Sequence, residues 1–184
     1  MPFLILILAV FFSIMGIAYA GVMLVYLVFC LPALVGAPFV PTPLKVVQKM
    51  IKLAEPKPGE TIYDLGSGDG RIVIEAVKNA NVRAVGIEVN PILVYLSRRK
   101  IKKLGLQEKA EIRWGNIFKT DLSSADIIFT YLLQPTNNLL EKRLLSKTKP
   151  GTRIVSLSFI FHKIPFVKSD PEHPSIRLYQ TPGR

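Results

Sequence analysis

The chain has 184 residues, which suits one globular domain with an appendage, and its formal net charge is +11. No Asp, Glu, Lys or Arg precedes Lys45, so residues 45–184 carry the whole excess, which favours an anionic partner such as a membrane surface or nucleic acid. The single cysteine excludes an intrachain disulfide, and the two histidines form no metal-ligand pattern with it, so we predict no metal site.

The first predicted element is a long apolar helix. Residues 3–31 are almost wholly apolar, and about 20 such residues are enough to span a bilayer. As one helix they would extend about 43 Å, which allows a tilted crossing. Pro32 and residues 36–38 end the run. We therefore predict one transmembrane helix, with residues 1–36 as an anchor and residues 37–184 as a second domain.

Three other interpretations of this apolar segment stay open. Residues 18–20 resemble a signal-peptidase site, although no basic region precedes the apolar run. A buried core helix would need a polar face, and a hairpin bending near Gly16 would have arms too short to span. Lys45, Lys49 and Lys52 follow the helix and no charged side chain precedes it. The positive-inside rule then predicts a single-pass membrane protein with its second domain on the cytoplasmic side.

Residues 39–59 predict an extended segment, a helix and a turn. The sequence FVPTP at residues 39–43 is extended, because proline disfavours helix at the residue before it. Leu44, Val47, Ile51 and Ala54 then recur on one face of a helix, and residues 56–59 (PKPG) predict a turn.

Residues 61–77 combine a short strand, a glycine-rich turn and a helix. Such a turn presents backbone N–H groups and a positive helix end, and glycine lets a flat ligand approach the backbone closely. The spacing D-x-G-x-G-x-G from Asp64 to Gly70 differs from the dinucleotide-binding pattern. It resembles motif I of the class I S-adenosylmethionine (SAM) methyltransferases. That resemblance implies that Asp64 meets the ammonium group of the cofactor; an unrelated glycine-rich turn is the alternative.

The next strand, predicted at residues 82–88, ends on Glu88. This acid lies twenty residues beyond Gly68, a placement suited to accepting both ribose hydroxyls of a nucleoside. Asn90 and Pro91 then predict an N-cap and first turn of a helix that runs to about Leu104. Its basic residues from Arg98 to Lys103 favour a solvated face over a specific site.

The remaining pattern alternates strands with one helix. Strands are predicted at 110–114, 125–131, 153–159 and 176–180, and a helix runs from Pro135 to about Lys147. The alternation predicts an α/β fold, a Rossmann-like and mostly parallel sheet with helices on both faces, preceded by the N-terminal transmembrane helix. The tail has room for a hairpin of strands six and seven but little room for a helix between strands five and six.

Several stretches together resemble a narrower family. An apolar anchor is followed by FVPTP, DLGSGDGRIVIEA, GIEVNPILVYLSR and KPGTRIVSLSF. This combination resembles the membrane-anchored protein-lysine methyltransferases that act on the ATP synthase c-subunit and the adenine nucleotide translocase, in a short prokaryotic-type form. The resemblance covers residues 39–160 and implies SAM as cofactor. It implies the cofactor-binding set Pro41, Thr42, Asp64, Gly66, Ser67, Gly68, Asp69, Gly70, Glu88, Asn90, Asn116 and Ile117.

Within that set, the resemblance places Pro41 and Thr42 over the methionine end of the cofactor and Asn116 and Ile117 around adenine. Many relatives have an acid where this chain has Asn116, but an amide oxygen can also accept from the adenine amino group. Specificity elements often lie after strand five, where this chain is short, so the substrate is the weakest inference from the resemblance.

Methyl transfer to lysine requires alignment and a neutral amine. Losing the ammonium proton at pH 7 costs roughly 4.6 kcal/mol from the ordinary lysine pKa of about 10.4, and a desolvating channel lowers that pKa. We therefore expect apolar and aromatic walls and no required Asp or Glu base. Tyr131, at the end of the fourth strand, is the predicted substrate-facing residue, with Phe39 and Phe159 as weaker candidates.

Acceptors other than a lysine of a membrane protein are also compatible with parts of the sequence. The same cofactor site would serve methylation of a lipid or quinone at the membrane. Nucleic-acid amino-methylases carry [N/D/S]-P-P-[Y/F] after the fourth strand, whereas residues 131–135 read YLLQP, so nucleic acid is a disfavoured partner. A non-enzymatic tether is disfavoured by the intact Asp64, glycines and Glu88.

Overall fold

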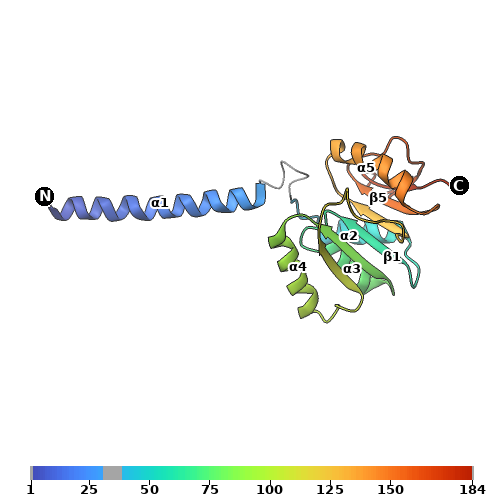
Figure 1. Cartoon of the computed structure of the whole chain (residues 1–184), viewed down its shortest axis with the longest axis horizontal. Helices are drawn as coiled ribbons and strands as arrows, with labels where there is room; N and C mark the ends of the chain where they lie inside the picture. The colour runs from blue at the N-terminus through green and yellow to red at the C-terminus, as the bar shows by residue number, and fades with distance from the viewer. Residues whose placement is uncertain (1, 31–38, 184) are drawn as a thin grey trace. The chain divides into compact units, whose positions relative to one another are not determined.

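The structure is a computed structural model that describes residues 2–30 and 39–183. The chain divides into two compact units, one ending at Phe39 and the other beginning at Val40 (Figure 1). The predicted helix-ending residues Pro32 and 36–38, and the predicted boundary at residue 36, fall outside the described residues.

The described part of the first unit is the helix α1 (Pro2–Cys30), of 29 residues, followed by Phe39. It continues through Gly16, which contradicts the hairpin interpretation, and its side chains are exposed from residue 2 to residue 26, which contradicts the buried core helix. Its length and composition suit a membrane crossing, as a window of mean hydropathy 2.6 indicates. The crossing itself stays a prediction.

The second unit is built on a seven-stranded sheet of order β3-β2-β1-β4-β5-β7-β6. The first five strands are parallel to their neighbours, while β7 runs antiparallel to β5 and β6 antiparallel to β7. The sheet therefore confirms the predicted mostly parallel architecture. Its strands are β1 (Thr61–Leu65), β2 (Arg83–Glu88), β3 (Ala110–Trp114), β4 (Ile127–Thr130), β5 (Arg153–Leu157), β6 (Phe166–Ser169) and β7 (Ile176–Gln180).

Two predicted strands are shorter than the sequence indicated. The strand expected at 125–131 covers only Ile127–Thr130, and the strand expected at 153–159 ends at Leu157. Ser158 has a φ of 67°, a left-handed conformation that turns the chain out of the sheet. Apolar character alone therefore overestimated the length of both strands.

Helices cover both faces of the sheet, unequally. Helices α2 (Leu44–Ala54), α3 (Arg71–Asn79) and α4 (Pro91–Lys103) share one hydrophobic core with strand residues such as Ile62 and Phe129. Ser156 lies on the opposite face, since Val155 and Leu157 belong to that core, and Asn137 of α5 (Gln134–Lys147) contacts its hydroxyl at 3.4 Å. Within the described residues, α5 is the only helix on that second face.

The second face carries fewer helices because two connections between strands contain none. The β3–β4 segment (115–126) and the β5–β6 segment (158–165), both fully described, contain turns and no helix. The shortage of room predicted between strands five and six is thus confirmed. In place of a helix, Glu141 of α5 accepts the backbone N–H groups of Lys163 and Ile164, and Gln134 exchanges two hydrogen bonds with Ile160.

Helix α2 differs from its expected face at one position. Val47, Met50, Ile51 and Ala54 are buried, but Leu44 at the first turn is exposed. The helix begins directly after Pro43, so Leu44 lies one turn before the first buried residue of the helix, Val47. The other helices follow the sequence within one residue at each end, and Asn90 caps α4 as predicted by accepting the N–H of Ile92 at 2.9 Å.

Candidate active site

The glycine-rich turn links the carboxyl end of β1 to the start of α3. Gly66, Gly68 and Gly70 have φ of 85°, 55° and 75°, in the left-handed region where a side chain costs energy. The N–H groups of Gly66 and Ser67 donate to the carbonyl of Ile87 at 2.9 and 3.0 Å, so the turn is held against β2. The sequence therefore predicted the strand, the turn and the helix correctly, and the structure explains why each glycine is needed.

Asp64 is the most unusual group at this edge. Its side chain is on the face shared with α2 and α3, the residue is only 3% exposed, and among the described residues no hydrogen-bond donor reaches its carboxylate. Burial, reinforced by the negative charges of Glu88 and Asp69, raises its pKa to about 8. A buried carboxylate without a partner is costly. The site is therefore electrostatically prepared to receive a cation.

Glu88 joins the two loops that follow β1 and β2. One carboxylate oxygen accepts the N–H of Gly68 at 2.8 Å and the other accepts the N–H of Asn90 at 2.8 Å. A carboxylate has about four lone-pair positions, so each oxygen keeps capacity for a further donor. The residue is buried, at the carboxyl end of β2, where ligands bind in open α/β sheets. Its position matches the predicted acceptor of two ribose hydroxyls.

Ser67 adds a second polar group without a partner. Its hydroxyl is buried, and within the described parts of the chain it makes no hydrogen bond. A buried polar atom without a partner is uncommon in folded proteins. Together with the carboxylate of Asp64 beside it, this hydroxyl fits a ligand that carries both a cation and hydrogen-bonding groups, as SAM does.

Asp69 is bonded to two basic side chains beside the glycine-rich turn. Its carboxylate accepts the Nε and Nη2 of Arg71 at 2.8 and 2.9 Å and lies 3.5 Å from the Nζ of Lys100. Burial works against its ionisation, but the hydrogen bonds from Arg71 and the two positive charges lower its pKa below the usual value. Asp69 therefore helps to hold the turn in shape, and its predicted contact with the cofactor stays a prediction.

Arg71 also fixes the segment that precedes α2. Its Nη1 donates to the carbonyl of Thr42 at 2.5 Å, and Thr42 is buried while Pro41 beside it is exposed. The structure thus brings the Pro41-Thr42 segment to the glycine-rich turn, the neighbourhood that the resemblance implied. The role of these two residues at a bound cofactor stays a prediction.

The loop after β3 reaches the same edge. The N–H of Gly115 donates to the backbone carbonyl of Glu88 at 2.9 Å, which places Asn116 and Ile117 next to the end of β2. The side-chain oxygen of Asn116 already accepts the N–H of Phe118 at 2.8 Å, so it stabilises its own turn. One lone pair of that oxygen is left for the predicted contact with adenine.

Tyr131 follows β4, whose register pairs Thr130 with Leu65 of β1. It is half-buried and packs against the core on the α2 and α3 face, the face that holds Asp64. The predicted substrate-facing residue therefore lies at the carboxyl edge, on the face that holds Asp64, and its contact with a substrate stays a prediction. Phe159 lies beyond β5 and its carbonyl accepts the Ser156 hydroxyl, while Phe39 belongs to the other unit.

Sequence reasoning missed three residues that shape the turn, namely Arg71, Gly86 and Ser97. A Cβ on Gly86 would lie 2.6 Å from the Cβ of Ser67 and from the Cδ1 of Ile112, so β2 needs a glycine where the turn crosses it. The fully buried Ser97 of α4 donates to the carbonyl of Gly68 at 2.9 Å. A glycine inside a strand and a serine on the buried face of a helix were the available signals.

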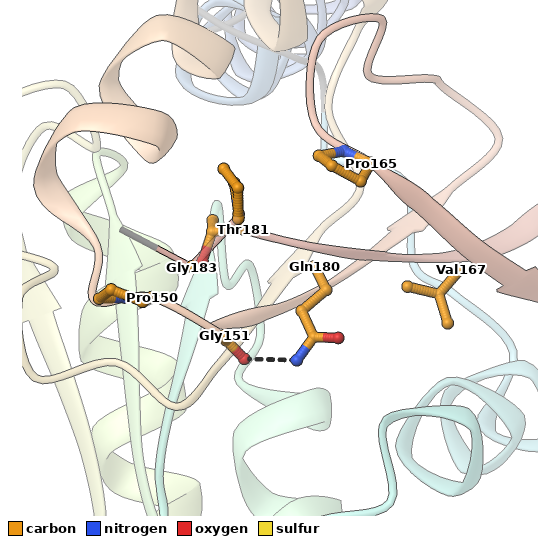
Figure 2. Close-up of a pocket in the computed structure, with 8 residues that line it drawn as sticks. Pro150, Gly151, Pro165, Val167, Gln180, Thr181 and Gly183 are labelled. Atoms are coloured by element: carbon orange, nitrogen blue, oxygen red, sulfur yellow. Dashed lines mark hydrogen bonds between the residues drawn. The ribbon is translucent and has the colours of Figure 1, made fainter.

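Two other features concern metal ligands and a hollow in the surface. No cluster of three His, Cys, Asp or Glu side chains suited to a metal occurs in the described residues. The hollow in Figure 2 lies between the amino end of β5 and the end of β7, where Gln180 donates to the carbonyl of Gly151 at 3.2 Å. It is at the opposite edge of the sheet from Asp64 and Glu88.

Comparisons with known proteins agree with this geometry. The family model described as the ANTKMT methyltransferase domain matches residues 64–168. A protein-lysine N-methyltransferase of Saccharolobus islandicus is 43% identical over 123 residues, covering 66% of this chain and 76% of that protein. The mouse ATP synthase c-subunit lysine N-methyltransferase is 32% identical over 167 residues, covering 88% of this chain and 65% of its own length.

A solved structure is similar over most of the second unit. It is a crystal structure of an RNA methyltransferase from Salinibacter ruber in complex with S-adenosyl-L-homocysteine. The TM-score is 0.73 at 38% sequence identity, and the match covers 79% of this chain and 95% of that chain. A geranyl diphosphate methyltransferase in complex with SAM, at 16% identity and a TM-score of 0.56, shares the fold alone.

Proposed function

The chain belongs to the ANTKMT methyltransferase family, and we propose that it transfers a methyl group from SAM to a lysine side chain of a membrane-associated protein. The main support for SAM binding is the pair of buried acids at the carboxyl edge of the sheet, Asp64 and Glu88. Asp64 has no hydrogen-bond donor among the described residues. The lysine is supported by the names of the Saccharolobus and mouse relatives. The membrane association of the substrate is supported by the mouse relatives named for the ATP synthase c-subunit and for adenine nucleotide translocase.

SAM supplies an electrophilic methyl group on a sulfonium, and the chain's residues bind and orient it. Asp64 would pair with the ammonium group, which supplies the positive charge that its carboxylate lacks. Glu88 would accept the ribose hydroxyls with the lone pairs that Gly68 and Asn90 leave free. Asn116 and Ile117 would frame adenine. The leaving group is a neutral thioether, so no acid is required there, and the main task is alignment.

The acceptor lysine must reach the site as a neutral amine. At pH 7 this costs roughly 4.6 kcal/mol from the ordinary lysine pKa of about 10.4, and desolvation beside apolar and aromatic groups reduces the cost. Tyr131 is half-buried at the carboxyl edge and packs on the face that holds Asp64. Tyr131 is therefore the proposed wall of the lysine channel, with its hydroxyl and ring orienting the amine.

The proposed setting is a single-pass membrane protein with the methyltransferase domain on the cytoplasmic side. Helix α1 has the length and hydropathy of a membrane span. The lysines that follow it, Lys45, Lys49 and Lys52, favour retention of that flank in the cytoplasm. An anchored enzyme would search for its substrate in two dimensions, close to lysines at the membrane surface.

Two other acceptors have specific support. A lipid or quinone would use the same cofactor site, and the apolar α1 would bring the enzyme to it. RNA is favoured by the net charge of +11 and by the similarity to the RNA methyltransferase of Salinibacter ruber. Against RNA, residues 131–135 lack the [N/D/S]-P-P-[Y/F] pattern of nucleic-acid amino-methylases.

A labelling experiment separates the three acceptors. Membranes and cytosol of the source organism, prepared without this protein, receive the full chain and methyl-labelled SAM. Protein, organic-phase and RNA fractions are then counted. Asp64→Asn should remove the label, and Glu108→Gln, which changes an exposed acid outside the site, should not.

We expect label in a protein band of the membrane fraction, located on a lysine by mass spectrometry. Label confined to the organic phase would replace the proposal with a lipid or quinone methyltransferase. Label confined to RNA would replace it with RNA methylation. Equal labelling by wild type and Asp64→Asn would contradict the cofactor site itself.

A further inference from the structure

The outer face of α4 carries an unusual set of exposed side chains. At 100° per residue, the positions Ile92, Tyr95, Leu96, Arg99, Lys102 and Lys103 fall within a stripe about 120° wide, and all of them are exposed. The first half of the stripe is apolar and the second half is basic. We name this stripe, together with Trp114, the α4 face.

Trp114 extends the apolar half of the α4 face. It is the only tryptophan in the chain and is 68% exposed at the end of β3. Its Nε1 donates to the carbonyl of Val89 at 2.9 Å, next to the N-cap of α4. Tyr95 is 63% exposed on the first turns of the helix. Exposed Trp and Tyr beside aliphatic side chains are typical of surfaces that meet the membrane interface.

The basic half of the α4 face has no acidic counterpart. Residues 89–107 contain five Lys and Arg residues and no Asp or Glu. Lys100 pairs with Asp69 and Arg98 donates to the carbonyl of Ile112, but Arg99, Lys102 and Lys103 form no ion pair with any acid that the structure describes. Three such cations on one face attract an anionic surface, and each adds to the attraction.

The chain itself brings a membrane within reach of this face. Helix α1 ends at Cys30 and α2 begins at Leu44, so thirteen residues connect them. Even fully extended, they reach only about 45 Å. If α1 spans a bilayer as proposed, the second unit is held near that bilayer, and a weak surface becomes effective at high local concentration.

We propose that the α4 face docks on the anionic surface of the bilayer that α1 crosses. This inference rests on the proposed anchoring by α1. The apolar half would insert at the level of the headgroups while Arg99, Lys102 and Lys103 contact lipid phosphates. Ile92 and Leu96 favour lipid over RNA, because aliphatic side chains neither stack on bases nor pair with phosphates.

Docking in this way has a consequence for the active site. The apolar half of the α4 face adjoins Asn90 and the end of β3, so it lies at the carboxyl edge where Glu88 and Asp64 are found. An anchored domain that rests on this face directs that edge toward the headgroup layer. A lysine of a membrane protein that emerges from the lipid would then meet the cofactor without leaving the surface.

The single tryptophan makes the test direct. The full chain is reconstituted into phosphatidylcholine vesicles with brominated acyl chains, with or without about one third phosphatidylglycerol, and Trp114 fluorescence is recorded. In anionic vesicles at low salt we expect a blue shift and at least a twofold quenching. In neutral vesicles, and in anionic vesicles at 1 M salt, the emission should stay close to that of the protein in detergent.

Charge reversal supplies the matched comparison. Arg99→Glu/Lys102→Glu/Lys103→Glu should remove most of the quenching in anionic vesicles. Lys78→Glu/Lys142→Glu/Lys147→Glu, which changes three exposed lysines on other helices, should keep it. Both variants should retain the wild-type affinity for S-adenosylhomocysteine, because none of these residues belongs to the cofactor site.

Three results would overturn the docking proposal. They are absence of quenching in anionic vesicles, equal quenching in neutral and anionic vesicles, and quenching that survives in the α4 triple variant. If single-stranded RNA quenches the Trp114 fluorescence and vesicles do not change it, the α4 face binds RNA and not lipid. Flotation with neutral vesicles tests α1 alone, so a failure of anchoring is distinguished from a failure of docking.

Discussion

Asp64 and Asp126 lie at opposite edges of the sheet: Asp64 is in β1, and Asp126 directly precedes the neighbouring parallel strand β4. At the amino edge, Asp126 accepts the N–H of Thr61 at 2.8 Å and pairs with the Nζ of Lys149 at 2.5 Å. Although burial opposes its ionisation, these partners lower its pKa. At the carboxyl edge, no described residue gives Asp64 such a partner, and its pKa is raised to about 8.

The same contrast applies to the arginines of the two edges. Arg153, at the amino edge, pairs with Glu60 at 2.5 Å and donates to the carbonyls of Ala54 and Glu55. Its bonds fasten α2 to the sheet. At the carboxyl edge Arg71 holds Asp69 and Thr42 and leaves Asp64 untouched. The acids of the amino edge are therefore paired with basic groups, while the carboxyl edge keeps one buried acid, Asp64, without a basic partner among the described residues.

Among substitutions at the two edges, Glu88→Ala is expected to cause the largest loss of cofactor affinity. The substitution removes the acceptor of the Gly68 and Asn90 N–H groups, which is also the proposed acceptor of two ribose hydroxyls. Charge-assisted hydrogen bonds contribute about 1.5–3 kcal/mol each, so affinity for S-adenosylhomocysteine should fall more than about 100-fold. Isothermal titration calorimetry provides the measurement. Glu88→Gln, which keeps the shape of the side chain, should lose less affinity. An affinity of Glu88→Ala within threefold of the wild-type value would contradict the assignment of Glu88 to the cofactor site.

Asp64→Asn should weaken binding and stabilise the ligand-free protein. The pKa of Asp64 is about 8 in the folded state and about 3.9 in the unfolded chain. Between these two pH values the folded state binds one proton more than the unfolded state, so the folded protein loses stability as the pH rises toward 8. The neutral amide removes this penalty. We expect a gain on the order of a few kcal/mol at pH 8–9 that vanishes near pH 4, seen in thermal melts from pH 4 to 9.

A saturating cofactor supplies the control for that prediction. The bound cation would stabilise the ionised Asp64, so the stability advantage of Asp64→Asn should disappear when S-adenosylhomocysteine is in excess. A variant less stable than wild type at every pH would mean that Asp64 is a structural residue.

Gly86→Ala should affect both stability and binding, by smaller amounts. The added methyl group would lie 2.6 Å from the Cβ of Ser67, so the glycine-rich turn must shift. Overpacking of this kind costs about 1–3 kcal/mol, and the displaced turn should bind S-adenosylhomocysteine several-fold more weakly. Gly115→Ala is the matched control, since its Cβ would find ordinary contact at 3.9 Å. Identical melting temperatures and affinities for Gly86→Ala and wild type would show that the turn tolerates the methyl group.

Arg153→Met should have the smallest effect on the affinity for S-adenosylhomocysteine. The domain should lose about 1–2 kcal/mol of stability, because Glu60 and two backbone carbonyls lose their partner at a partly exposed site. Affinity for S-adenosylhomocysteine should stay within twofold of wild type. Arg83→Met, which removes an exposed pair with Glu111, should change neither quantity. A tenfold loss of affinity in Arg153→Met would show that the two edges are not independent.

The sequence predicted the order of strands and helices along the chain better than the limits of each element. Alternation of apolar strands and helices was enough for the parallel sheet, and Asn90 was identified as an N-cap from its position before Pro91. The left-handed Ser158 that ends β5 was not foreseeable, because no local pattern marks a serine for that conformation.

The site was predictable where chemistry depends on spacing and was missed where it depends on contacts between distant residues. Asp64, the glycines and Glu88 follow from a motif and a twenty-residue interval. The different surroundings of Asp64 and Asp69 required the structure, since the two acids are five residues apart and only Asp69 is bonded to Arg71 and Lys100. Ser97 reaches Gly68 across 29 positions, a contact that no sequence pattern indicated.

The most direct test of the central claim is proton release on binding. At pH 7, Asp64 of the ligand-free protein, with a pKa of about 8, is mostly protonated, and a bound ammonium group would drive that proton off. Calorimetric titration of S-adenosylhomocysteine in buffers of different ionisation enthalpy counts the protons exchanged. We predict that wild type releases close to one proton more than Asp64→Asn. Equal proton exchange and equal affinity in the two proteins would contradict the account.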